Sequence, residues 1–140
     1  MIDHDKLKKS LRHLEAQYAN HQRAQHRPEL TEIDREGIAE SVIQRFETCY
    51  DTLWKDLRRH LMEVLGLPEV PSSPKPILRL AGQNDLLPSP VEQWLKYADA
   101  RVGTSHDYSG DKAAQALAIM ESFITDGINL YQTMTKTPWA

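Results

Sequence analysis

Apolar residues recur every three or four positions through the middle of this chain, and this spacing constrains the fold more than any other feature. The members are Val42, Phe46, Tyr50, Leu53, Leu57, Leu61 and Leu65. Such spacing places all of them on one face of an α-helix. Ile43 and Trp54 widen that face, and Gly66 followed by Pro68 ends the pattern. The sequence therefore predicts a long amphipathic helix, capped by Thr31, whose apolar face is wider than one bundle seam needs.

Shorter helical patterns lie on both sides of this central helix. Residues 3–24 are expected to form an amphipathic helix, and residues 77–81 a short one that ends at Gly82. Ser89, followed by Pro90, is expected to cap a further helix, and Asp111 to cap the last. The predicted inward positions of these two helices are Val91, Trp94, Leu95, Ala98 and Val102, then Leu117, Met120, Ile124, Ile128 and Tyr131.

No segment alternates apolar and polar residues as a strand does. The predicted fold class is therefore all-α, a four- to five-helix up-and-down bundle. Residues 1–140 are expected to form one domain with its core at about 31–134. The wide stripe on the central helix further suggests a homodimer, because a small bundle would leave part of it exposed.

The bulk composition excludes several classes of protein. The net charge of −3 argues against a dedicated nucleic-acid coat protein, although a local basic cleft remains compatible with it. The single Cys49 allows no internal disulfide, and no signal-peptide pattern or long apolar run is present. We expect a cytoplasmic protein that does not enter a membrane. The sequence lacks the common metal-ligand and phosphate-loop motifs, so no metal or cofactor is expected.

The segment from Arg101 to Tyr108 contains more side chains that could bind or react with a substrate than any other part of the chain. It holds a guanidinium at Arg101, an imidazole at His106 and a phenol at Tyr108, with Gly103 between them. On a continuous helix Arg101 and His106 would face different sides, but a left-handed Gly103 would let the chain fold back. An arginine and a histidine that converge suit a phosphodiester. Otherwise Arg101 only neutralises a helix end and His106 is a solvated loop residue.

Three other groups of residues have alternative interpretations. Thr104 and Ser105 are weaker candidates that could position a phosphate through hydroxyl or backbone donors. A second group, with helical spacing on the central helix, is expected to be a solvated face and not a cation site; it comprises Asp56, His60 and Glu63. Trp54 and Trp94 are expected to be core residues and not platforms for bases.

Two segments resemble one known superfamily. Phe46-Glu47…Trp54-Lys55 is similar to a helix of the HEPN superfamily, and Arg101 to Tyr108 fits its Arg-x4-His-x-Tyr pattern. Within that superfamily the chain resembles the nucleotidyltransferase substrate-binding proteins and the HepT-like toxins. The resemblance implies a dimeric helical bundle with metal-independent ribonuclease activity. It also implies a small nucleotidyltransferase partner that acts as antitoxin by attaching AMP to a tyrosine.

Carried onto this sequence, the resemblance assigns catalysis to Arg101 and His106 and the AMP modification to Tyr108. One position departs from the pattern: the residue after the motif arginine is usually polar, and here it is Val102. A valine side chain cannot donate a hydrogen bond to a phosphate. Two alternatives therefore stay open. One is a non-catalytic subunit that binds nucleotide or substrate for its partner enzyme, and the other is a plain helical scaffold.

Overall fold

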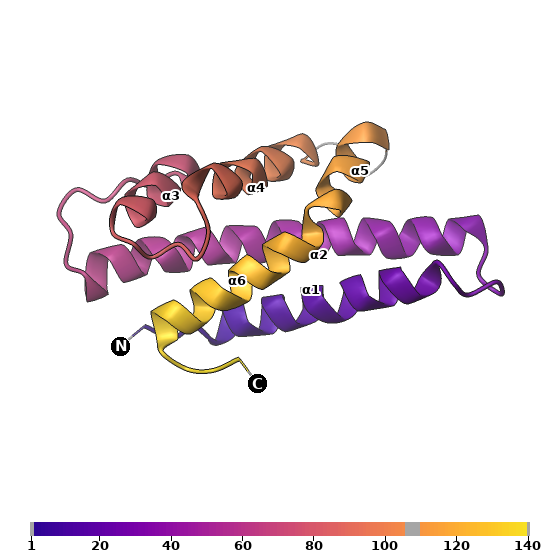
Figure 1. The fold of residues 1–140 in the computed structure, drawn as a ribbon, viewed down its shortest axis with the longest axis horizontal. Coiled ribbons are helices and arrows are strands. Elements are labelled where there is room, and N and C mark those ends of the chain that lie inside the picture. The colour runs from indigo at the N-terminus through magenta and orange to yellow at the C-terminus, as the bar shows by residue number, and fades with distance from the viewer. Residues whose placement is uncertain (1, 106–109, 140) are drawn as a thin grey trace.

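Two long helices pack against each other in an antiparallel arrangement and run along the length of the molecule (Figure 1). They are α1, Asp5–Ala24, and α2, Glu32–Arg59, in a computed structural model that describes residues 2–105 and 110–139. Leu7, Leu11 and Leu14 of α1 are fully buried, as the apolar spacing requires. Ile43 of α2 is also fully buried. The wide stripe of α2 is therefore largely covered within one chain, by helices packed on two sides of it.

The start and end of α2 follow their sequence signals. The Thr31 hydroxyl accepts from the Asp34 amide at 3.1 Å, and the Asp34 carboxylate accepts from the Thr31 amide at 2.9 Å. This reciprocal pair satisfies two amides that the first helical turn leaves without partners. At its other end α2 widens into one π-helical turn, His60–Val64, before Gly66 at φ 64° ends the helical run. The predicted cap and stop are both confirmed.

The next two helices, α3 (Pro74–Gln83) and α4 (Val91–Gly103), pack beside α2. The helix predicted at 77–81 is longer, because Pro74 supplies the fixed φ that suits a first helical position. The predicted cap at Ser89 is wrong. Pro90 is the residue that precedes α4, and the Ser89 hydroxyl donates instead to Asp126 at 2.9 Å. A tertiary contact with the last helix thus replaces the local one.

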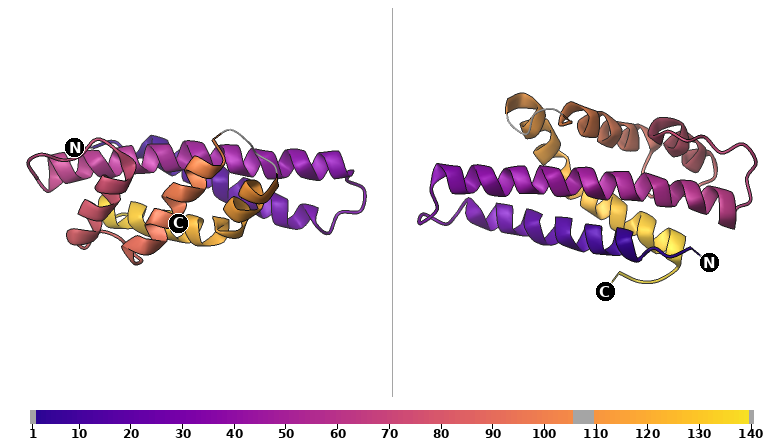
Figure 2. Two further views of the ribbon diagram at one scale, coloured as in Figure 1. Left: turned by 90° about the horizontal axis from the view of Figure 1, so that it is seen from above. Right: turned by 180° about the vertical axis from the view of Figure 1, so that it is seen from behind.

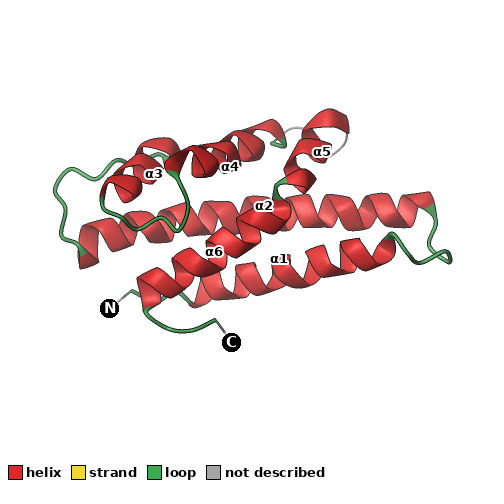
Figure 3. Cartoon of the chain, viewed as in Figure 1, coloured by secondary structure: helices red, strands yellow, loops and turns green. Residues whose placement is uncertain are grey.

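The predicted last helix is two helices, α5 (Gly110–Ala118) and α6 (Met120–Thr135). They meet at Ile119, and α5 points away from the line of α6 (Figure 3). Asp111 lies inside α5 and is not its cap. The two views of Figure 2 show α6 crossing one face of the α1–α2 hairpin. At that crossing Gly127 lies against Leu11, so close that a Cβ atom there would be 2.9 Å from a Leu11 methyl group.

Aromatic rings join α2, α4 and α6 into one core. Phe123 of α6 contacts Phe46 at 4.9 Å and Tyr97 at 5.1 Å between ring centroids, and Tyr97 contacts Trp94 at 5.3 Å. All three contacts are edge-to-face, a favoured geometry for aromatic pairs. Trp94 is a core residue as predicted. The inward position predicted for Val102 is wrong, since 70% of that residue is exposed.

The predicted all-α bundle is confirmed: the elements are helices throughout the described residues. In residues 2–105 and 110–139, none of the helices has both the length and the hydropathy that crossing a membrane requires.

Candidate functional site

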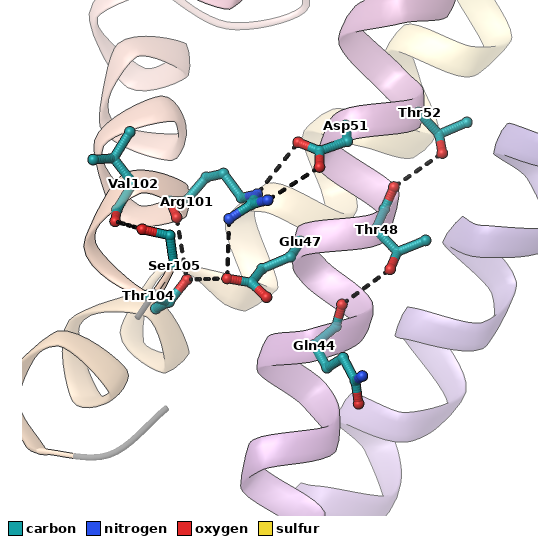
Figure 4. Close-up of polar contacts among 9 residues, drawn as sticks. All are labelled: Gln44, Glu47, Thr48, Asp51, Thr52, Arg101, Val102, Thr104 and Ser105. Atoms are coloured by element: carbon teal, nitrogen blue, oxygen red, sulfur yellow. Dashed lines mark hydrogen bonds and ion pairs between the residues drawn. The ribbon is translucent and has the colours of Figure 1, made fainter. Parts of the chain in front are cut away.

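Arg101 lies in the last turn of α4, where it meets two carboxylates from α2 (Figure 4). Its Nε and Nη2 donate to the two oxygens of Asp51 at 3.3 and 3.2 Å, and its Nη1 donates to Glu47 Oε2 at 3.1 Å. Glu47 and Asp51 are four residues apart, so they share one face of α2. A two-point contact of this kind fixes the plane of the guanidinium as well as its position.

Thr104 contacts this cluster of charged side chains from the protein interior. It is fully buried, and its hydroxyl donates to Glu47 Oε2 at 2.9 Å. The same carboxylate oxygen therefore holds both the arginine and the residue that follows α4. This placement gives Thr104 a structural role and offers no support for the expectation that its hydroxyl positions a phosphate.

The other residues of the motif differ from Arg101 and Thr104 in their exposure and contacts. Ser105 is exposed and its hydroxyl donates to the Val102 carbonyl at 2.7 Å. Gly103 is the last residue of α4 and lacks the left-handed conformation expected of it; Gly66 and Gly110 are the described glycines with positive φ. The expectations for His106 and Tyr108 concern positions outside the described residues. Their segment joins the end of α4 to the start of α5.

A pocket of about 490 Å³ lies beside Arg101, between α2, α3 and α4. Trp54 and Lys55 of α2 contribute to its wall, and Lys75 contributes from the first turn of α3. The Lys55 ammonium is 5.8 Å from the centre of the Trp54 ring. A pocket of this volume is within the usual range for small-molecule sites. Its lining joins aromatic surface to three cations and the carboxylate of Asp51, and aromatic surface with cations is a combination suited to a nucleotide.

A second polar cluster lies at the C-terminal end of α2, where the sequence predicted a solvated face. That expectation is wrong for Asp56 and His60, which are 3% and 5% exposed. The carboxylate of Asp56 contacts His4 Nδ1 at 3.0 Å and also pairs with Arg59. Burial, with further effects of His4 and Lys136, lowers the pKa of His60 below its usual range. The cluster anchors the segment before α1 to the end of α2.

Metal ligation finds no support in the described part of the chain, where acidic, histidine and cysteine side chains form no group of three or more that could hold an ion. Cys49 is buried, and burial raises the pKa of its thiol to about 12. That thiol is a packing group at neutral pH.

The model of a family described as "nucleotidyltransferase substrate binding protein like" matches residues 2–136. This chain belongs to that family. The match spans nearly all of the sequence, including both segments whose resemblance pointed to it.

A crystal structure of a protein from Thermus thermophilus has the same fold. The TM-score is 0.65, and the likeness covers 86% of this chain and 98% of that one. The two sequences are 24% identical, so the likeness is one of fold. No match was found among curated proteins.

The partners of Arg101 within this family member were not predicted as partners. In the sequence, Glu47 belongs to the motif Phe46-Glu47…Trp54-Lys55, and Asp51 lies in the same segment. Their spacing of four on a helix was the available signal, because it marks two carboxylates that can face one neighbour. What the sequence does not show is which neighbour they face, since the contact with Arg101 spans 50 positions or more.

Proposed function

We propose that this family member is a metal-independent endoribonuclease of the HEPN type that works as a toxin with a small nucleotidyltransferase. The observation that carries the proposal is the fixed position of Arg101 at the edge of the pocket between α2, α3 and α4. The two carboxylates hold the guanidinium in place, so it needs little reorganisation when a phosphate approaches. Lys55 and Lys75 add positive charge around the same pocket.

The proposed reaction is transphosphorylation of an RNA strand. His106, five residues beyond Arg101, takes the proton of a ribose 2′-hydroxyl as general base. The 2′ oxygen then forms a bond to the adjacent phosphorus while the bond to the 5′ oxygen breaks, and that oxygen takes a proton from water. Arg101 stabilises the negative charge on the pentacoordinate phosphate. The products are a 2′,3′-cyclic phosphate and a 5′-hydroxyl end.

Purified protein should cleave RNA in the presence of excess EDTA. His106→Ala should lower the cleavage rate by about 10²- to 10⁴-fold, the usual contribution of a general base. Arg101→Ala should lower it by about 10²- to 10³-fold, as loss of a transition-state donor does. Gel analysis of end-labelled RNA measures both, with circular dichroism as the check on folding. Full activity in both variants, or activity that disappears with EDTA, contradicts the proposal.

The alternative function is that of a non-catalytic subunit that binds nucleotide or substrate for its partner. Two observations favour it: Val102 supplies no polar group next to Arg101, and the charge of Arg101 is compensated by Glu47 and Asp51. In that case wild-type protein binds nucleotide without cutting RNA. Val102→Asn is the informative variant, because a gain of cleavage would show that the valine had disarmed an otherwise complete site.

The partner is proposed to silence the ribonuclease through Tyr108. An AMP on that phenol would place a bulky, negatively charged group two residues from His106, where it would compete with RNA for Arg101. Co-expression with a small nucleotidyltransferase encoded next to this chain, followed by intact-mass measurement, should show a gain of one AMP. Tyr108→Phe should abolish it. An unmodified protein in a stable complex would mean inhibition by contact alone.

A further inference from the structure

A polar pocket of about 230 Å³ lies in the groove between α1 and α2. Its lining side chains all carry a polar group and none of them is a carboxylate: they are Ser10, His13, Ser41, Gln44, Arg45 and Thr48. In Figure 4, Gln44 and Thr48 lie on the opposite side of α2 from Arg101. This pocket, called the α1–α2 pocket below, is therefore separate from the candidate site, and the two pockets have no lining residue in common.

Helical spacing brings these polar side chains together. Ser41, Arg45 and Thr48 are four and three residues apart, so they share one face of α2. Ser10 and His13 are three residues apart and share one face of α1 in the same way. The view from behind in Figure 2 shows these two helices side by side along their length. The α1–α2 pocket is thus built from both helices of the hairpin.

Arg45 meets a neutral ring in this pocket instead of a carboxylate. Its Nη1 donates to His13 Nδ1 at 3.3 Å. A guanidinium has no acceptor, so the His13 ring accepts at Nδ1 and carries its hydrogen on Nε2. Among residues 2–105 and 110–139, none of the ion pairs includes Arg45. The pocket therefore holds a positive charge that the described side chains do not compensate by direct contact.

Uncharged donors at the same pocket are also unused. Within the described part of the chain, the Ser41 hydroxyl and the Gln44 side-chain amide make no hydrogen bond. The Ser10 and Thr48 hydroxyls, by contrast, already donate to carbonyls of their own helices at 2.9 and 3.3 Å. Two neutral donors thus join the guanidinium and imidazole N–H groups around one volume. A ligand with negative charge and several acceptor oxygens would satisfy all of them.

Two lysines extend the positive charge along α1. Lys6 and Lys9 precede Ser10 and His13 by four residues each, so they lie on the same side of the helix. Both lysines are exposed, and Asp5, one turn before Lys9, offsets part of their charge. Exposed cations near a pocket raise the local concentration of anions and speed their approach.

We propose that the α1–α2 pocket binds a phosphate group, with Arg45 supplying the charge and His13 and Ser41 donating to the phosphate oxygens. A volume of about 230 Å³ is below the roughly 300 Å³ at which small-molecule sites usually begin, so the pocket takes one anionic group and not a whole nucleotide. A phosphate suits donors from two helices because its oxygens point in several directions. The phosphate is either free or part of a nucleic-acid strand. The proposal stands apart from the ribonuclease proposal, because none of these residues belongs to the Arg101 site.

Titration with inorganic phosphate at constant ionic strength tests the site through the NMR signals of the His13 ring. Saturable shifts are expected for the wild type and should persist in Arg101→Ala. Arg45→Gln should weaken binding by about 10- to 100-fold, the usual effect of losing a hydrogen bond to a charged group. Ser41→Ala should weaken it by about 2- to 10-fold, as loss of a neutral donor does. Arg79→Gln is the matched control: this exposed arginine of α3 lies outside the pocket, and because salt screens its charge the affinity should change by less than about twofold.

A second titration, with an uncleavable 2′-O-methyl RNA tetranucleotide, identifies the source of the phosphate. If a strand occupies the pocket, the tetranucleotide shifts the same His13 signals and binds more weakly to Arg45→Gln. If the ligand is free phosphate, inorganic phosphate shifts those signals and the tetranucleotide does not. Circular dichroism checks the fold of each variant. Absence of saturable shifts with both probes, or equal losses in Arg45→Gln and Arg79→Gln, overturns the phosphate site whether or not the protein cleaves RNA.

Discussion

Glu47 and Asp51 bind the same arginine but in different surroundings. The Glu47 side chain is 10% exposed and also accepts from the buried Thr104, whereas the Asp51 side chain is 39% exposed. Carboxylates in water contribute little to stability through an ion pair, because solvent screens the charge. A buried carboxylate with two donors contributes more, since its removal leaves those donors poorly satisfied. Both residues position Arg101, but we expect Glu47 to contribute more to the stability of the fold than Asp51.

The neutral isosteres of the two carboxylates should differ in their effect on stability. Glu47→Gln should lower the free energy of unfolding by about 1–3 kcal/mol, because Arg101 and Thr104 lose a charged acceptor. Asp51→Asn should lower it by less than about 1 kcal/mol. Urea unfolding followed by circular dichroism measures both. Equal losses would show that burial does not separate the two carboxylates.

Helix ends and helix crossings show where local signals stop being sufficient. Thr31 caps α2 because Asp34, which makes both capping hydrogen bonds with it, lies within the same turn. Ser89 has an equally good local signal, but Asp126 competes for its hydroxyl from α6. The break between α5 and α6 at Ile119 carries neither glycine nor proline. The apolar pattern therefore predicted one continuous helix, while packing of α6 across α1 and α2 gives the two helices different directions.

Two helical glycines should respond oppositely to substitution by alanine. Gly37 in α2 has open space where a Cβ would lie, so Gly37→Ala should stabilise the protein by about 0.5–1 kcal/mol through helix propensity. Gly127 in α6 has the same propensity to gain. A Cβ there would be 2.9 Å from Leu11, and overpacking costs of about 1–3 kcal/mol should make Gly127→Ala destabilising. Thermal unfolding of both variants measures the difference, and stabilisation by both would show that Leu11 moves aside freely.

The whole molecule leaves some large apolar residues on its surface. Ile33 near the start of α2 is 78% exposed, and Val102 beside the candidate site is 70% exposed. The sequence-based argument for a dimer relied partly on Ile43, which proves to be buried by the chain itself. Exposed apolar surface next to Arg101 now supports the dimer better than the width of the α2 stripe does.

We predict a homodimer that pairs around the Arg101 face. Sedimentation at micromolar concentration should show about twice the 16.1 kDa of one chain. Val102→Glu should shift the protein toward monomer, because it places a charge in that interface. Ile33→Glu is the matched control at a distant exposed position and should leave the assembly unchanged. A single 16.1 kDa species for the wild type would contradict the dimer, and an effect of Ile33→Glu alone would move the interface elsewhere.

The helical class, the long central helix with its cap and stop, and the family were all predictable from the amino-acid sequence. These features depend on residues a few positions apart, where helical geometry leaves little choice. The sequence also singled out Arg101, because a guanidinium next to a histidine and a tyrosine is a local pattern. The packing of the helices in three dimensions was needed to show that Glu47 and Asp51 hold that arginine and that Asp56 and His60 are buried. Each of those depends on contacts between helices far apart in the chain, which local spacing does not encode.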